Sequence, residues 1–139
     1  MREGITVEAL NKMNKNTIME HLDIVFTEVG EDFIKGKMPV DKRHHQPMGL
    51  LHGGASVVLA ETLGSTAAHC SIDLEKQFCV GLEINANHLR GVREGHIHGI
   101  AKPIHRGQST QVWEIKISND NGQEVCVSRI TMAILDKNK

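Results

Sequence analysis

The fold is organised around one stretch, His52-Gly53-Gly54-Ala55-Ser56-Val57-Val58-Leu59-Ala60-Glu61-Thr62-Leu63-Gly64-Ser65-Thr66-Ala67-Ala68-His69. On a helix, its apolar and small residues would occupy nearly every side instead of one i, i+3, i+4 stripe, which is typical of a helix enclosed by other protein. Glu61 is the single carboxylate within it. Because burying an unpaired carboxylate costs several kcal/mol, Glu61 is the first candidate for chemistry.

Composition narrows the class of protein. With 139 residues, the chain is expected to form one domain over 1–139. A formal net charge of -1 and scattered Lys and Arg argue against nucleic acid or an anionic membrane as a partner. Three cysteines without close pairing predict free thiols, and the absence of an apolar signal region or transmembrane run predicts a cytoplasmic protein.

The segments around this helix predict strands. Thr6 can cap a short helix over 7–13, and residues 21–29 and 32–40 read as strands joined by a hairpin at Gly30-Glu31. A polar loop at 41–51 then leads to the central helix. After it, alternation predicts strands over 77–89, 96–105, 111–118 and 124–135, separated by turns. An α+β fold, with a curved antiparallel sheet wrapped around one long helix, would explain both patterns.

Motifs on both sides of the helix carry a resemblance to a known family. They are Gln46-Pro47-Met48-Gly49-Leu50-Leu51-His52-Gly53-Gly54 followed by Glu61, the run from Val80 to His88, and Val112-Trp113. Together they resemble the hotdog-fold acyl-CoA thioesterases of the Arthrobacter-type 4-hydroxybenzoyl-CoA thioesterase clade, and within it chiefly the 1,4-dihydroxy-2-naphthoyl-CoA and enterobactin-proofreading thioesterases. The resemblance implies hydrolysis of an aromatic or medium-chain acyl-CoA, with Glu61 as nucleophile or general base.

The chemistry of thioester hydrolysis fits the same residues. Negative charge develops on the carbonyl oxygen, so a site needs fixed donors there and an activated oxygen at the carbonyl carbon. Gly53 and Gly54 would let a carbonyl approach the N–H groups at the helix start, and we expect the Gly54 amide to polarise it. Gln46 would add an amide donor if the loop folds back, and His52 would position that loop or donate a hydrogen bond. Glu61 in apolar surroundings would be poorly solvated and therefore a stronger base or nucleophile.

These residues also have structural interpretations. Glu61 could be a buried carboxylate satisfied by Ser65 one turn further on, which adds Ser65 to the candidate site. His52 alone could be a hydrogen-bonded structural histidine. The other histidines show no zinc-site spacing, so no metal is expected. The cysteines have no basic neighbours and read as packed thiols, and Trp113 reads as core.

Coenzyme A would need contacts for its phosphates. Arg106 offers a fork matched to phosphate, and the turn after it offers N–H groups and hydroxyls, although a solvated hairpin turn is the alternative. CoA would belong to the substrate, so no separate cofactor is expected. In similar thioesterases, the nucleotide and pantetheine contacts fall at the positions of Gly81, of His88, Leu89, Arg90 and Gly91, and of His105, Arg106, Gly107, Gln108, Ser109 and Thr110.

Two other classes of function stay open on the sequence. A hotdog hydratase or dehydratase would also bind acyl-CoA or acyl carrier protein, but no Asp and His arrangement like the hydratase motif is present. A non-catalytic acyl-CoA sensor is the second alternative.

Helix geometry predicts that two chains build each site. The Cα atoms of Gly54 and Glu61 would lie about 10 Å apart along the axis, whereas the reacting oxygen must come within about 3–3.5 Å of the carbonyl carbon. An antiparallel helix from a partner would bring its Glu61 to this Gly54 and create two identical sites. Edge-to-edge pairing of the sheets would also cover open strand edges. We therefore expect a homodimer, or a dimer of such dimers.

Overall fold

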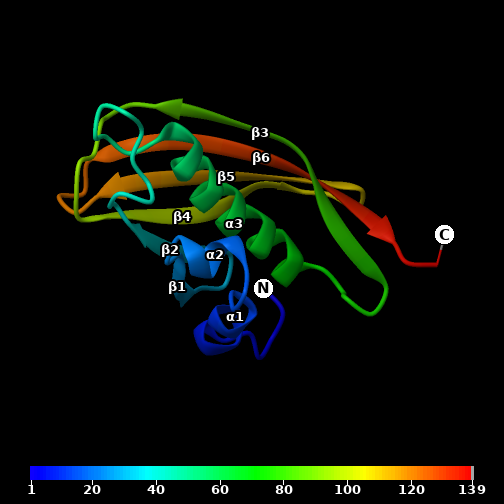
Figure 1. The fold of residues 1–139 in the computed structure, drawn as a ribbon. Helices are drawn as coiled ribbons and strands as arrows, with labels where there is room; N and C mark the ends of the chain where they lie inside the picture. The colour runs from blue at the N-terminus through cyan, green and yellow to red at the C-terminus, as the bar shows by residue number, and fades with distance from the viewer. Residues whose placement is uncertain (139) are drawn as a thin grey trace.

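The computed structural model describes residues 1–138 and forms one sheet with a long helix across it (Figure 1). The helices are α1 (Val7–Met13), α2 (Ile18–His21) and α3 (Gly53–Ser71). The strands are β1 (Val25–Val29), β2 (Ile34–Pro39), β3 (Gln77–His88), β4 (His96–Arg106), β5 (Thr110–Asn119) and β6 (Glu124–Asp136). They pair antiparallel in the order β1-β2-β4-β5-β6-β3. This is the predicted α+β arrangement.

Close packing seats α3 on the sheet. Leu59 and Leu63 of α3 are fully buried between the helix and the sheet, together with Trp113 and Ile115 of β5. Glycine makes this approach possible, since a Cβ added at Gly99 of β4 would lie 2.5 Å from Leu63 Cδ1. The buried core among residues 1–138 is therefore mainly aliphatic, with Phe26 and Trp113 as its aromatic side chains, which confirms Trp113 as core.

One side of α3 is uncovered, and the prediction of a helix enclosed on every side is wrong for the single chain. Gly54 and Glu61 are exposed, while Val58, Thr62 and Ser65 are only partly buried. The reason is that small and weakly apolar residues populate this side, so its hydropathy differs little from that of the side packed on the sheet. The sequence pattern could not separate the two.

The predicted elements are confirmed with shifts of up to three residues at their ends, except that the first predicted strand begins four residues late. Residues 21–24, predicted as the start of a strand, follow or end α2, and β1 begins at Val25. The side chain of Thr17 caps α2 by accepting a hydrogen bond from the Met19 N–H at 3.2 Å. A single helical turn has no repeating apolar pattern, which is why the sequence concealed it.

β3 is a long edge strand with apolar side chains open to solvent. It pairs with β6 along one edge, and no other described strand pairs with its second edge. Phe78, Val80 and Leu82 are 41%, 42% and 62% exposed. A long apolar edge of this kind is suited to pairing with another chain.

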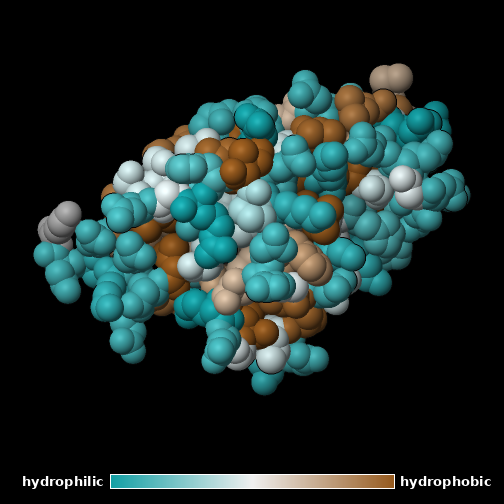
Figure 2. Space-filling view, turned by 180° about the vertical axis from the view of Figure 1, so that it is seen from behind, coloured by the Kyte–Doolittle hydropathy of each residue, from teal (hydrophilic) through white to brown (hydrophobic). Residues whose placement is uncertain are grey.

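The face turned away in Figure 1 is mainly hydrophilic, with hydrophobic residues in separate patches (Figure 2).

The three cysteines are free thiols, as predicted. Burial raises the pKa of Cys70, Cys79 and Cys126, which suits packed thiols better than nucleophiles. None of the described helices combines the length and the apolarity that crossing a membrane requires.

Candidate active site

The start of α3 presents an amide that is already capped and one that is not. His52 is the N-cap residue, and its Nδ1 accepts a hydrogen bond from the Gly54 N–H at 2.8 Å. The predicted donor Gly54 is therefore occupied. The N–H of Gly53, one residue earlier, has no hydrogen-bond partner among residues 1–138. Gly53 is thus the free backbone donor at this helix terminus, where the helix dipole also favours negative charge.

Gly53 lies directly against the end of β3. A Cβ added there would be 2.7 Å from His88 Nε2, so a side chain at this position would displace the imidazole. The glycine therefore serves close packing as well as access to its amide. This contact brings together one residue predicted to act at the carbonyl and one predicted to bind CoA.

The loop at 41–51 folds back over the helix start, as its proposed role requires. The His52 N–H donates to the His44 carbonyl at 2.7 Å, and the Gln46 N–H donates to the Leu50 carbonyl at 2.8 Å. Gln46 Oε1 accepts the Met48 N–H, whereas its Nε2 has no partner among the described residues. One pocket is lined by Gln46, Gly53, His88, Leu89, Arg90 and Gly91.

A polar cluster that the sequence analysis missed anchors this loop. The His44 side chain is fully buried, with Nε2 2.9 Å from the Leu22 carbonyl and Nδ1 accepting the Asp41 N–H at 3.1 Å. Arg43 hydrogen-bonds to Asp41 and holds the pKa of that carboxyl well below its usual range. The cluster depends on contacts with the distant residue Leu22, so local sequence gave no signal of it.

Glu61 projects from the uncovered side of α3 toward β3. A Cβ added at Gly81 would lie 3.5 Å from Glu61 Oε2, which places the carboxylate beside that strand. The predicted apolar burial of Glu61 is wrong for the single chain, because its side chain is exposed. Pairing with Ser65 is also absent, since Ser65 Oγ instead lies 3.8 Å from Met132 Sδ. Glu61 has no hydrogen bond or ion pair within residues 1–138.

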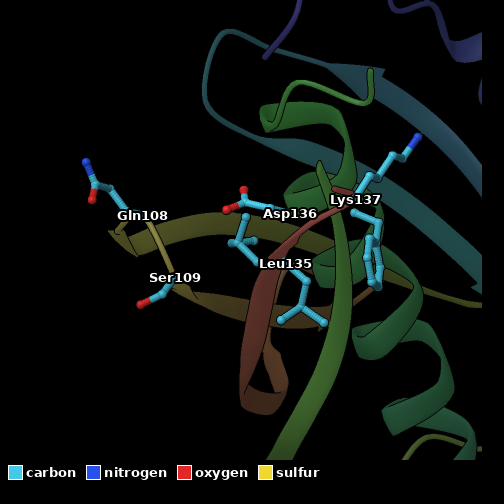
Figure 3. A pocket seen from close by; sticks show the side chains of 7 residues that line it. Gln108, Ser109, Leu135, Asp136 and Lys137 are labelled. Atoms are coloured by element: carbon cyan, nitrogen blue, oxygen red, sulfur yellow. The ribbon is translucent and has the colours of Figure 1, made fainter. Parts of the chain in front are cut away.

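Apart from Gly81, which lies beside Glu61, the predicted CoA contacts form two groups that one chain keeps apart. His88 to Gly91 lie at the amide end of α3, at the end of β3. His105 to Thr110 lie at the β4–β5 turn, where Arg106 shares a pocket with Gln77 at the start of β3. Figure 3 shows Gln108 and Ser109 on this turn, beside the last residues of β6. Along β3 the two groups are separated by about 36 Å at 3.3 Å per residue.

Metal ligation has no candidate cluster in the part of the chain that the structure describes. No group of three or more His, Cys, Asp or Glu side chains there could hold an ion. The candidate site itself consists of one carboxylate, backbone and side-chain amides, and imidazoles.

Comparison with known proteins gives consistent matches. The family model described as "Thioesterase superfamily" matches residues 48–126. The chain is 52% identical to 1,4-dihydroxy-2-naphthoyl-CoA hydrolase of Escherichia coli, over 96% of this chain and 98% of that protein. It is 49% identical to the proofreading thioesterase EntH of Cronobacter sakazakii, over 96% and 97%. A crystal structure of a mutant thioesterase from Pseudomonas aeruginosa superposes with a TM-score of 0.95 at 48% identity, covering 97% of both chains.

Proposed function

This chain belongs to the thioesterase superfamily and is a thioester hydrolase, and from that premise we propose that it hydrolyses aromatic or medium-chain acyl-CoA with Glu61 as nucleophile or general base. One observation carries the proposal. The Glu61 carboxylate and the Gly53 N–H lie on the same helix, and neither has a hydrogen-bond partner among residues 1–138. The names of these relatives favour hydrolysis over hydration or non-catalytic binding. No cofactor is required beyond the CoA of the substrate.

The proposed reaction divides between the two ends of this helix face. The Gly53 N–H and the Gln46 Nε2 amide would bind the carbonyl oxygen and stabilise the negative charge that develops there. Glu61 would either attack the carbonyl carbon directly or remove a proton from an attacking water. In both cases the C–S bond breaks, one water is consumed, and the acid and the CoA thiol leave. His52 would act as a positioning residue that caps the helix through Gly54.

We propose that these two ends meet across a homodimer. Gly53 and Glu61 of one chain are separated by about 12 Å along α3, too far for one carbonyl to contact both. The uncovered side of α3 and the open apolar edge of β3 support a partner on this side. Two-fold pairing would put Glu61 of each chain at the Gly53 amide of the other.

The same pairing would complete the CoA site. If β3 pairs antiparallel with the partner's β3, the start of one strand lies beside the end of the other. The Arg106–Thr110 turn of one chain would then approach His88 to Gly91 of its partner. Arg106 would bind phosphate oxygens, and Arg90 would do so from the other chain. The two separated groups of predicted contacts thus support an antiparallel dimer.

The test is release of the CoA thiol from benzoyl-CoA, followed with a thiol reagent. Glu61→Gln should lower kcat by about 10²–10⁴-fold, since that is the typical contribution of a positioned acid or base. Glu75→Gln, in the turn after α3, is the matched control and should keep full activity. Near-native turnover by folded Glu61→Gln protein would refute the role of Glu61. In a parallel assay with crotonyl-CoA, loss of the enoyl-CoA absorbance without thiol release would indicate hydration instead.

A further inference from the structure

A mainly apolar cavity adjoins Glu61 on the uncovered side of α3. It has a volume of about 280 Å³ and lies between α1, α3, β3 and β6. Gly81 and Ser65 line it. Gly81 lies beside the Oε2 atom of Glu61, and Ser65 follows Glu61 by one helical turn. The volume is at the lower end for ligand pockets, so it suits one or two rings or a short chain.

His69 supplies the polar group in this cavity. It lines the wall two turns beyond Glu61, and its ring nitrogens have no hydrogen-bond partner among the described residues. Burial lowers the pKa of His69, with smaller contributions from Arg2 and Lys137, so the imidazole is neutral near pH 7. A neutral imidazole offers one donor and one acceptor. An unpaired, partly buried imidazole in an apolar wall is suited to a hydrogen bond from a ligand.

Helix spacing fixes how far this group lies from the reacting carbon. Glu61, Ser65 and His69 follow one another at i, i+4 and i+8, so they share one side of α3. Glu61 and His69 are about 12 Å apart along the axis, and both side chains lean the same way. With reacting atoms about 3.3 Å apart and a hydrogen bond of about 2.8 Å, roughly 6 Å remains between the carbonyl carbon and the group bound by His69. One ring with a substituent opposite the carbonyl spans this length.

The short helix α1 closes the far wall of the cavity. Leu10 is buried and anchors α1 to the core, whereas Met13, the last residue of α1, is 62% exposed and lines the cavity. A flexible thioether at this position limits the length of a ligand without being part of the core. α1 precedes the region matched by the family model, residues 48–126.

We infer that, within the function proposed above, this cavity takes the acyl group and His69 selects acyl groups with an apolar body and a hydrogen-bonding substituent about 6 Å from the carbonyl carbon. Met13 sets the upper limit of length. His69 is thus a specificity-determining residue and takes no part in breaking the C–S bond.

The test compares kcat/KM for benzoyl-CoA and 4-hydroxybenzoyl-CoA, which differ by one hydroxyl opposite the carbonyl. His69→Leu should lower the ratio of 4-hydroxybenzoyl to benzoyl turnover by about 2- to 10-fold, the range expected for one hydrogen bond. His69→Gln keeps a donor and an acceptor and should retain part of the preference. His21→Leu, an exposed histidine on α2, should leave the ratio unchanged.

A second pair of measurements addresses the end wall. Met13→Ala should raise kcat/KM for decanoyl-CoA relative to hexanoyl-CoA, and Met13→Trp should lower it, because Met13 is exposed and neither change disturbs the core. Hydrolysis by every variant with unchanged substrate ratios would overturn this inference and leave the proposed function intact. Failure of the unaltered protein to release thiol from any of the four substrates would overturn both.

Discussion

The two ends of the uncovered side of α3 differ in how complete they are. At the start of the helix, the His52 cap, the His88 ring over Gly53 and the folded loop with Gln46 fix the positions of the amides within one chain. Around Glu61, by contrast, the carboxylate is exposed and without partners in residues 1–138. The amide end is preorganised within one chain and the carboxylate end is not, and the proposed dimer would supply the missing wall from a second chain.

After Glu61→Gln, the next largest loss of kcat is expected at the amide that binds the carbonyl oxygen at the preorganised end. Gly53→Val should lower kcat by about 10²–10³-fold, because its side chain would displace His88 and block a carbonyl from the amide. Gly54→Val should cost less, since its Cβ meets only the exposed His52 ring at 2.9 Å. Steady-state kinetics with a circular dichroism control would measure both. The reverse order of effects would return the donor role to Gly54.

A smaller effect is expected at the β4–β5 turn, remote from the carbonyl. Arg106→Ala should raise KM for acyl-CoA about tenfold or more with little change in kcat, since a hydrogen bond to a charged group contributes about 1.5–3 kcal/mol. Arg90→Ala should act in the same direction. Arg129→Ala on β6 is the control and should behave like the unaltered enzyme. Equal penalties on acyl-CoA and acyl-pantetheine would show that these arginines do not bind the phosphates.

The free energy of unfolding should depend on the His52 cap at the start of α3. His52→Ala removes the acceptor for the Gly54 N–H and should lower the free energy of unfolding by about 1 kcal/mol. His52→Asn keeps a good capping residue and should restore most of it. Urea unfolding would measure the difference, and equal stability of the alanine and asparagine variants would contradict the capping role.

The smallest expected effect is a pH dependence of stability caused by His69, which lies beyond Glu61 on α3. Because the pKa of His69 is lowered in the folded chain from 6.5, the unfolded chain binds its proton first as the pH falls. His69 therefore costs stability progressively below about pH 6.5. His69→Gln should lose less stability than the unaltered protein between pH 7 and pH 5 in urea unfolding. An identical loss in both proteins would show that His69 is not desolvated.

The sequence predicted the fold well where periodicity is strong. The alternation at 96–105 and 111–118 correctly predicted strands β4 and β5, and Ile97 and Ile115 on one face of each are fully buried. It failed at α2, which is too short to show a period, and at Val58 to Ser65, where small residues concealed an uncovered side. Both failures have one cause, because hydropathy patterns carry little information in short or weakly polar segments.

The site was predicted in parts but not in arrangement. Motif spacing selected Gln46, His52, Gly54 and Glu61; the structure joins His52 to Gly54 and places Gln46 beside Gly53 instead. It could not reveal that Gly54 is committed to His52, because a side-chain cap depends on the rotamer of the histidine. The anchoring role of His44 and the cavity wall at His69 arise from tertiary contacts between distant segments.

The most direct test of the shared site is activity in mixed dimers. Glu61→Gln and Gly53→Val chains, each inactive alone, would be combined and their exchange verified by mass spectrometry of differently tagged chains. A heterodimer would hold one site with both residues intact, so random 1:1 assortment should restore about a quarter of the unaltered activity. Verified heterodimers with no activity above that of either parent would contradict a site built by two chains.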